Sequence, residues 1–362
     1  MKNIYKHSNF SPDIFGHGGN KRTAQINELL INANINFREA KFSPFVPAGK
    51  NFLLYLKGII YNRDLKAGFK NNYAIGRYIR QFETYVKNIR PNFFILESTS
   101  EYNILLFEVL HNNNIPIIAL PHNIESLAYG FKSSFSNLKS PRWLFEELRY
   151  LEYCKKIFSI SREEHWLLSC TGLNASYLPY FPTFELERYL LKIRSQKQFI
   201  EKKKNQNKKI LLLGTFYNKP TLNGYIELIK NLKNYNDFEI IVAGFGAEKL
   251  NGMFVEKNVE VLGSVKNERL KNLIIECDYG IIHQEPSSGS LTRIPELLLA
   301  GLPLILNVHA ARSNFDIKGL KIYDSFTELK DMLSSFTPIL PPVLERPIEE
   351  KLFINYLRTT LN

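Results

Sequence analysis

The stretch of the chain that most constrains its fold is residues 287–307, S-S-G-S-L-T-R-I-P-E-L-L-L-A-G-L-P-L-I-L-N. Its middle part predicts a short helix from about Arg293 to Ala300, because Pro295 is tolerated only in a first turn and Gly301 suits a left-handed C-cap. The apolar run from Leu302 to Leu306 then predicts a buried strand. Such a helix directs free backbone N–H groups and the positive end of its dipole at the small residues before it, which favours a phosphate there.

Two charged side chains lie on this predicted helix. Arg293 and Glu296 are three residues apart and therefore share one face. A cation for a diphosphate and a carboxylate for ribose hydroxyls are both needed by a site that binds a nucleotide sugar. The plain alternative is a capped helix that enters a buried strand, as in any doubly wound domain.

The run R-I-P-E-L-L-L-A-G-L-P-L-I resembles the donor-site signature of GT-B glycosyltransferases, in particular the family 4-like enzymes of glycosyl transferases group 1. The resemblance implies that Glu296 holds the ribose of the nucleotide and that Arg293 takes part in catalysis. Many members carry a second Glu eight residues earlier, where this chain has Ser288. The contact to the sugar thus lacks its usual carboxylate.

The second half of the chain opens with Lys209-I-L-L-L-G-T, a predicted buried strand that ends at Gly214. Family members often place Arg after this glycine and Lys before a second glycine, and both grip the diphosphate. This chain has Thr215 and Asn223 there, so the role moves to Lys219 and Arg293. The residues that we expect on the donor are Gly18, Gly19, Gly214, Thr215, Lys219, Asn223, Ser288, Gly289, Ser290, Leu291 and Thr292.

The first half starts with a short predicted strand, Lys2 to Tyr5, and a loop that ends F-G-H-G-G-N. Asn20 is a plausible N-cap of the helix that follows. Gly18 and Gly19 resemble the glycine pair of the first loop in GT-B enzymes, which faces the donor.

A second polar turn, P-H-N-I-E-S at Pro121 to Ser126, follows the predicted buried strand Ile115 to Leu120. Ligands of α/β sheets collect beyond the carboxyl ends of strands, so His122, Asn123 and Glu125 are in the right place for chemistry. H-N-x-E at this position also resembles the acceptor side of the same glycosyltransferases, which implies that His122 bonds the transferred sugar or the acceptor. The alternative is a histidine that caps the following helix. The residues expected on the acceptor side are His17, Asn123 and Glu125.

The bulk properties narrow the class of protein. A net charge of +12 favours acidic partners, and much of it lies between Arg188 and Lys209, with Lys202 to Lys204 at its centre. That run is either a solvated linker helix or a membrane contact. The start of the chain lacks an apolar signal segment, no apolar run approaches a membrane span, and the three cysteines are far apart. We therefore expect a cytoplasmic protein, with the inner face of the cytoplasmic membrane as a second location.

These features predict an α/β protein of GT-B architecture, in which two Rossmann-like domains face each other across a cleft. The expected parts are an acceptor-side domain at residues 1–184, a charged linker at 185–208, a nucleotide-sugar-binding domain at 209–345, and a helix at 346–362 that returns to the first domain.

The resemblance implies a glycosyltransferase that retains anomeric configuration and moves a sugar from a nucleotide-sugar donor to a glycan or a lipid-linked acceptor. Surface polysaccharide or lipopolysaccharide synthesis is the expected setting. No D-x-D motif occurs, so a metal-dependent GT-A type of transfer is disfavoured, and neither a metal nor a cofactor is expected. Three alternatives stay open: a sugar-nucleotide epimerase using Glu97, Glu101 and Glu125, a basic nucleic-acid-binding protein, and a non-catalytic GT-B domain.

Overall fold

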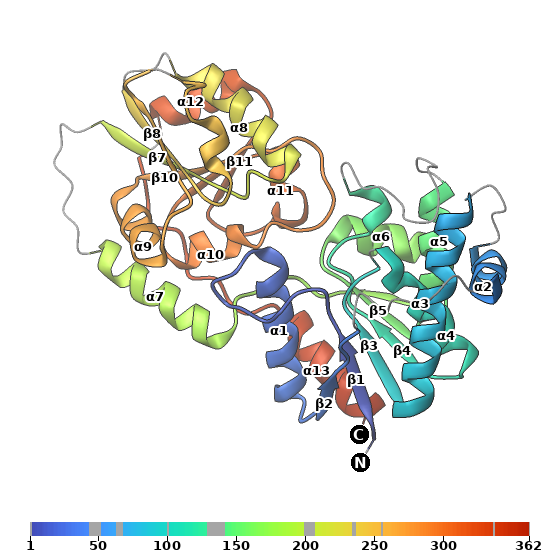
Figure 1. Ribbon diagram of the computed structural model, residues 1–362. Helices are drawn as coiled ribbons and strands as arrows, with labels where there is room; N and C mark the ends of the chain where they lie inside the picture. The colour runs from blue at the N-terminus through green and yellow to red at the C-terminus, as the bar shows by residue number, and fades with distance from the viewer. Residues whose placement is uncertain are drawn as a thin grey trace. The chain divides into compact units, whose positions relative to one another are not determined.

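The computed structural model describes residues 2–42, 52–62, 68–99, 101–128, 142–198, 207–233, 237–254, 256–335 and 337–361. The chain divides into two compact units (Figure 1). Unit 1 comprises Met1–Ser11, Ile26–Pro179 and Ile348–Asn362, and unit 2 comprises Pro12–Gln25 and Tyr180–Pro347. Each unit has its own parallel sheet with helices on both faces, so the predicted pair of Rossmann-like α/β domains is confirmed.

The sheet of unit 1 has the order β2-β1-β3-β4-β5-β6. Its strands are β1 (Ile4–His7), β2 (Phe37–Glu39), β3 (Phe93–Leu96), β4 (Ile117–Ala119), β5 (Lys156–Ser159) and β6 (Ala175–Tyr177). The helices are α2 (Phe52–Asn62), α3 (Gly68–Ile89), α4 (Ile104–Asn112), α5 (Arg142–Leu151), α6 (Arg162–Cys170) and α13 (Ile348–Leu361), with short 3₁₀ turns at Glu101–Asn103 and Glu125–Leu127. Helix α1 (Gly18–Asn32) is divided between the units after Gln25.

Alternate side chains of these strands enter two separate cores, because successive residues of a strand point to opposite faces. Phe93 and Ile95 belong to the core that contains residues of α1 and α13. Phe94 and Leu96 belong to the core that contains residues of α3, α4 and α5. Phe353 of α13 stacks edge-on against Phe158 of β5, with ring centroids 4.7 Å apart, so the last helix packs on the first unit as predicted.

The first strand lies two residues further along the chain than predicted, at Ile4–His7 instead of Lys2 to Tyr5. Lys6 is fully buried in it, and the hydropathy pattern gives no reason to expect a buried lysine. The helix expected to follow Asn20 begins at Gly18, so Asn20 lies inside the first turn and is not its N-cap.

The sheet of unit 2 has the order β12-β11-β10-β7-β8-β9. Its strands are β7 (Lys208–Leu213), β8 (Phe238–Ala243), β9 (Val259–Gly263), β10 (Tyr279–Ile282), β11 (Leu304–Asn307) and β12 (Leu320–Tyr323). The helices are α7 (Phe184–Gln198), α8 (Lys219–Leu232), α9 (Asn267–Glu276), α10 (Arg293–Leu299), α11 (Val308–Ala311) and α12 (Phe326–Ser335), with 3₁₀ turns at Ala247–Leu250 and Arg312–Asn314. Helix α10 and strand β11 lie where residues 287–307 predict them.

Much of the expected charged linker at 185–208 is part of unit 2. Leu186, Leu190 and Ile193 of α7 are buried in the core that also holds residues of α9 and α10. Arg194, 7% exposed, donates to the carbonyl oxygen of Leu298 at 3.2 Å. The many charged residues of α7 predict a solvated linker, although the helix also carries an apolar stripe that packs in this core. The run Lys202 to Lys204 lies outside the described residues.

Across the described ranges, we find no helix with both the length and the apolar character that a membrane span requires.

Candidate functional site

In unit 2, the carboxyl end of β7 meets the first turns of α8 and α10. Gly214 follows β7, and a Cβ atom added to it would lie 2.8 Å from Thr221 Cγ2 and 3.8 Å from Arg293 Nη1. Gly244, with φ +128°, follows the neighbouring strand β8, and its added Cβ would lie 2.0 Å from the Gly214 carbonyl oxygen. These glycines let two backbone segments approach closely beneath the Arg293 guanidinium.

Several polar atoms near this point have no hydrogen-bond partner within the described part of the chain. They are Nε and Nη2 of Arg293, Oγ1 of Thr221, and both side-chain polar atoms of Gln284. Thr221 and Gln284 are at most 1% exposed. Buried groups of this kind normally have partners, because leaving one unpaired costs about 1–3 kcal/mol. A ligand rich in acceptor oxygens would satisfy the guanidinium.

Gln284 is placed by a side chain from the next strand. Asn307, at the end of β11, accepts from the backbone N–H of Gln284 at 3.2 Å and donates to its carbonyl oxygen at 2.9 Å. The same Asn307 caps α11 by accepting from the Ala310 N–H at 3.1 Å. The backbone after β10 is therefore fixed, although the Gln284 amide finds no partner among the described residues.

The predicted donor loop at 288–292 is held by an arginine that the sequence does not single out. Arg312 Nη2 donates to the carbonyl oxygens of Ser288 at 2.8 Å and of Gly289 at 2.6 Å. Its Nη1 donates to the His309 carbonyl oxygen at 2.8 Å. Gly289 has φ +75°, which favours glycine at this turn. Arg312 thus provides the hydrogen-bond donor for these two carbonyl oxygens of the loop.

Glu296, the residue predicted to hold a ribose, is already oriented by two donors. Tyr180 Oη donates to Oε1 at 2.7 Å, and Lys21 Nζ lies 2.6 Å from Oε2. Burial and the charge of Glu296 both raise the pKa of Tyr180, so its hydroxyl stays a donor. A carboxylate has about four acceptor positions, so two remain for a ligand.

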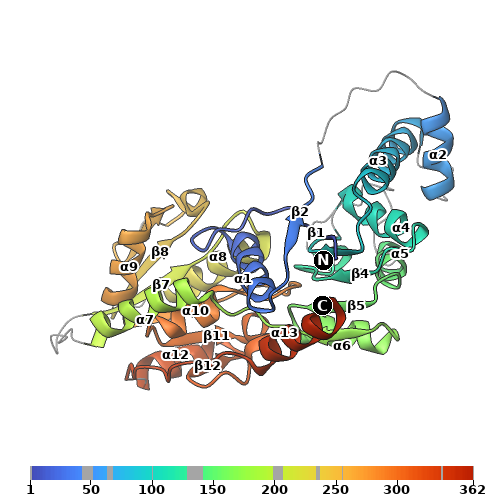
Figure 2. The same ribbon diagram turned by 90° about the horizontal axis from the view of Figure 1, so that it is seen from below.

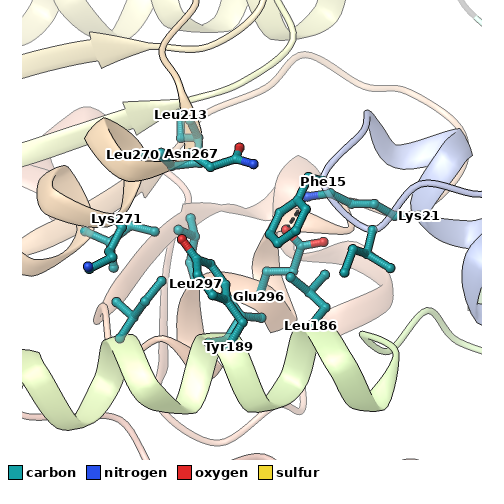
Figure 3. Close-up of a pocket in the computed structure, with 14 residues that line it drawn as sticks. Phe15, Lys21, Leu186, Tyr189, Leu213, Asn267, Leu270, Lys271, Glu296 and Leu297 are labelled. Atoms are coloured by element: carbon teal, nitrogen blue, oxygen red, sulfur yellow. Dashed lines mark hydrogen bonds and ion pairs between the residues drawn. The ribbon is translucent and has the colours of Figure 1, made fainter.

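A small pocket lies beside Glu296 (Figure 3). Its volume is about 60 Å³, and its walls include Phe15, Leu213, Asn267 and Tyr189. The Phe15 ring meets the Tyr189 ring edge-on at 5.3 Å and is 45% exposed. The pocket is mainly apolar, and its polar groups include the amide of Asn267, the carboxylate of Glu296 and the ammonium groups of Lys21 and Lys271. It has room for water, and a larger ring would enter only if Phe15 moved.

The glycine loop and Lys219, which are also predicted to contact the donor, have the following surroundings. The Cβ position of Gly18 is 3.4 Å from Thr292 Oγ1, so the glycine loop adjoins the donor loop within unit 2. His17 Nδ1 accepts from the Gly19 N–H at 3.2 Å and so supports this turn. Lys219 is exposed at the start of α8.

Thr215 and Asn223 occupy the positions of the missing cation pair. Thr215 is half-buried, and its carbonyl oxygen accepts from the Asn218 N–H at 3.2 Å. Asn223 donates to Glu285 Oε2 at 3.0 Å. Neither position carries a cation, so Arg293 is the residue of this site that we expect to contact a diphosphate.

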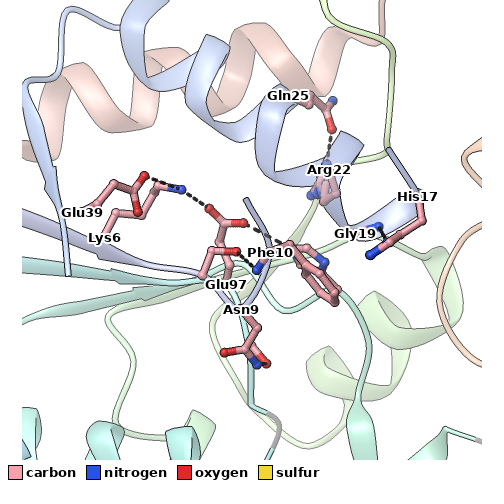
Figure 4. A network of polar contacts seen from close by, with 12 residues as sticks. Lys6, Asn9, Phe10, His17, Gly19, Arg22, Gln25, Glu39 and Glu97 are labelled. Atoms are coloured by element: carbon pink, nitrogen blue, oxygen red, sulfur yellow. Dashed lines mark hydrogen bonds and ion pairs between the residues drawn. The ribbon is translucent and has the colours of Figure 1, made fainter. Parts of the chain in front are cut away.

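In unit 1, the carboxyl ends of β1, β3 and β4 carry a buried ionic network (Figure 4). Glu97 accepts from Lys6 Nζ at 2.6 Å and lies 3.2 Å from His122 Nε2, while Lys6 also reaches Glu39 at 3.2 Å. Burial alone would raise the pKa of Glu97, but the His122 hydrogen bond and the Lys6 charge lower it to about 2. The Phe10 ring stacks on His122 with centroids 5.1 Å apart.

The turn after His122 is held by carboxylates. Glu164 accepts from the Ile124 N–H at 2.9 Å, and Glu147 accepts from the N–H groups of Glu125 at 2.9 Å and Ser126 at 2.8 Å. His122 bonds Glu97 and does not cap the 3₁₀ turn that follows. Asn123 and Glu125 are half-buried beside it. Among the described residues, no three His, Cys, Asp or Glu side chains gather as metal ligands would.

Five residues with a place in these sites are not expected from the sequence: Lys21, Tyr180, Thr221, Gln284 and Arg312. Only two of them carry a usable signal. Gln284 follows the strand before the donor loop, and Thr221 lies in the first turn after the second-domain strand. Lys21 and Tyr180 contact Glu296 from 275 and 116 residues away, and Arg312 bonds backbone carbonyl oxygens that its own sequence neighbourhood does not indicate.

The comparisons with known proteins concern structure alone. No family model matches the chain, and no curated protein matches it in sequence. Among solved structures, sucrose-phosphate synthase from Thermosynechococcus elongatus is similar, with 14% identity, a TM-score of 0.63 and coverage of 92% of this chain and 90% of that one. The lipopolysaccharide outer core galactosyltransferase WaaB and Anabaena HepE in complex with UDP each show 12% identity, a TM-score of 0.57 and coverage of 92% and 89%. The chain has the two-domain α/β fold of these glycosyltransferases, the GT-B fold that its sequence predicts.

Proposed function

We propose that the protein is a metal-independent glycosyltransferase whose nucleotide-sugar donor binds to unit 2. The observation that carries the proposal is the guanidinium of Arg293 above Gly214, whose Nε and Nη2 have no partner among the described residues, with Thr221 beside it. A diphosphate offers the acceptor oxygens that these donors lack. A charge-assisted bond from Arg to phosphate is stronger than a neutral one, and two such bonds fix the orientation of the ligand.

The nucleoside end of the donor would lie toward Glu296. Tyr180 and Lys21 hold the carboxylate in place and leave acceptor positions for ribose hydroxyls. The base would enter the apolar pocket between Phe15 and Asn267, with the exposed Phe15 ring moving to admit it. This assignment supports a nucleotide donor without identifying its base.

Catalysis would rest on positioning and on stabilising the departing nucleotide diphosphate. Arg293 would offset the negative charge that develops on the leaving phosphate. Lys219, exposed at the start of α8, would add a second cation. Retention of the anomeric configuration follows from the sequence resemblance and is part of the proposal.

The acceptor would be a glycan or a lipid-linked sugar used in surface polysaccharide or lipopolysaccharide synthesis, at the inner face of the cytoplasmic membrane. His122 supports an acceptor or sugar contact from unit 1, because Glu97 fixes its Nε2 and leaves Nδ1 to bond a hydroxyl. HepE is described in complex with UDP and glucose, and WaaB as a galactosyltransferase, so hexose donors are the first to test.

The epimerase alternative has less support from Glu97, one of its three candidate carboxyl groups. An epimerase of this fold needs carboxyl groups that exchange protons, and Glu97 is fully buried against Lys6 with its pKa lowered to about 2. Such a group remains ionised and is a poor proton donor at neutral pH.

The decisive experiment combines binding and turnover. Thermal unfolding is measured with UDP, GDP, ADP, TDP and CMP, and the stabilising nucleotide then defines which UDP-, GDP- or related sugars are offered with a panel of acceptors. We expect one nucleotide to raise Tm and Glu296→Gln to weaken that rise, while the surface variant Glu276→Gln leaves it unchanged. If no nucleotide binds, or if Glu276→Gln weakens binding as much as Glu296→Gln, the donor site is wrongly assigned.

A further inference from the structure

Unit 1 carries an extra helix outside the layer that covers its sheet. Helix α2 lies on the outer side of α3, which in turn packs on α4 (Figure 2). The contact is unusually close, because a Cβ atom at Gly58 would lie 1.7 Å from the Asn72 carbonyl oxygen and one at Gly76 would lie 1.8 Å from that of Leu54. The inner face of α2 is thus held firmly by backbone contact.

The outer face of α2 is apolar. Phe52, Leu53, Leu56 and Ile60 recur at helical spacing and are between 39% and 71% exposed. Phe69, at the start of α3, is 56% exposed beside them. Leu54, on the inner face, is buried, so the helix does not need these outer side chains to pack on α3.

Four aromatic rings connect the two helices in a row. The ring of Tyr55 lies 5.9 Å from Phe52 and 4.7 Å from Phe69, and the ring of Phe69 lies 6.1 Å from Tyr73. This aromatic row joins the aliphatic side chains of α2 into one surface. Contiguous exposed apolar surfaces on soluble proteins usually mark sites of interaction.

The same hairpin is strongly basic. Helices α2 and α3 carry five basic residues and a single acidic one, Glu83, which pairs with Lys57. On the inner side of α2, beside Leu54, a hollow of about 510 Å³ is lined by Lys41, Arg77 and Arg80, and the described residues around it include no carboxylate. An anionic surface would be attracted to this hairpin.

We infer that the outer face of the α2–α3 hairpin docks on a lipid bilayer that contains anionic lipid. Exposed aromatic and aliphatic side chains on one face of a helix, in a hairpin with a net positive charge, are typical of segments that lie in the membrane interface. A glycan would stack on the aromatic row but would not need the exposed aliphatic side chains of Leu56 and Ile60 beside it. The inference uses unit 1 alone and does not depend on glycosyl transfer.

The test is flotation of the full-length protein with vesicles of phosphatidylcholine alone and with roughly one third phosphatidylglycerol. The test variant is Leu53→Ser with Ile60→Ser. The matched control is Leu352→Ser with Ile339→Ser, because these side chains are 60% and 72% exposed on other parts of the chain. We expect binding to the anionic vesicles, at least a tenfold higher lipid concentration for half-binding in the test variant, and no change in the control.

Other outcomes overturn the inference. The protein does not float with anionic vesicles, or the control variant loses as much binding as the test variant. A third outcome is a dimer in light scattering that Leu53→Ser with Ile60→Ser dissociates while vesicles do not bind; the face then joins two copies of this chain. The nucleotide-induced rise in Tm, measured on the same variant, reports the donor site separately, so the two proposals can fail independently.

Discussion

Arg293 offers the sharpest test of the donor site, because the structure separates its role in binding from its role in folding. Its Nε and Nη2 make no hydrogen bond to any described residue, so Arg293→Gln breaks no internal bond through these atoms. We therefore expect the free energy of unfolding without ligand to fall by less than about 1 kcal/mol. Most arginines with buried nitrogens would show a much larger loss.

The effect on binding should be large. One hydrogen bond to a charged group contributes about 1.5–3 kcal/mol, so loss of the guanidinium should cost about 2.7 kcal/mol, or about a hundredfold in Kd. At a nucleotide concentration of about 100 Kd, the unaltered protein gains about 2.7 kcal/mol and the variant about 0.4 kcal/mol. For a unit of this size, these values correspond to a rise in Tm of about 5–10 °C and about 1 °C.

The assay is thermal unfolding with and without the nucleotide that stabilises the protein, beside calorimetric titration for Kd. Arg269→Gln is the matched control, because Arg269 is 45% exposed and its Nη1 reaches Glu276 at 3.4 Å on the surface. The reasoning is refuted if Arg293→Gln lowers unliganded stability by more than about 2 kcal/mol with Kd unchanged. Arg293 would then be an internal structural group and not a ligand contact.

Three further changes test other parts of the structure. Arg312→Gln removes three bonds to carbonyl oxygens, so the urea midpoint should fall by the equivalent of about 2–3 kcal/mol and nucleotide affinity should fall with it; equal stability would contradict its role. Gly244→Ala places a Cβ 2.0 Å from the Gly214 carbonyl oxygen at a φ of +128°, and urea unfolding should show a loss of about 3 kcal/mol or more. Because the pKa of Glu97 is lowered to about 2 in the folded protein, the unfolded chain takes up a proton on this carboxylate at a higher pH than the folded chain does. About 3 kcal/mol of stability is therefore present above pH 4.5 and is lost as pH falls toward 2. Urea titrations at stepped pH should show this acid slope reduced in Glu97→Gln, which is also less stable at neutral pH because Lys6 stays buried without that partner; an unchanged slope would count against the assignment.

Local chemistry makes the donor loop predictable. Proline tolerates only the first turn of a helix and glycine favours its end, so Pro295 and Gly301 fix the bounds of α10 within one residue. The buried strand β11 follows from an apolar run. The alternation of fully buried strands with amphipathic helices likewise predicts two parallel sheets from the amino-acid sequence alone.

Pairings across the chain cannot be predicted in the same way. Lys21 and Glu296 are separated by 275 residues, and nothing in the neighbourhood of either one indicates the other. Lys6 is a buried strand residue because Glu97 neutralises it, and the hydropathy of Lys6 alone argues against a strand there. In α7, the charged side chains mask an apolar stripe, so the sequence favours a linker where the structure has a packed helix.

The position of α13 has a consequence for synthesis of the protein on the ribosome. Phe353 and Leu357 complete a core whose last strand along the chain is β6, so the first unit lacks these side chains until α13 has been translated. At roughly 5–20 residues per second, the interval between β6 and α13 lasts about ten to thirty seconds. During that time an apolar surface of the nascent first unit is open to chaperones and to aggregation. Deletion of α13 should therefore reduce soluble yield through the unit that is synthesised first.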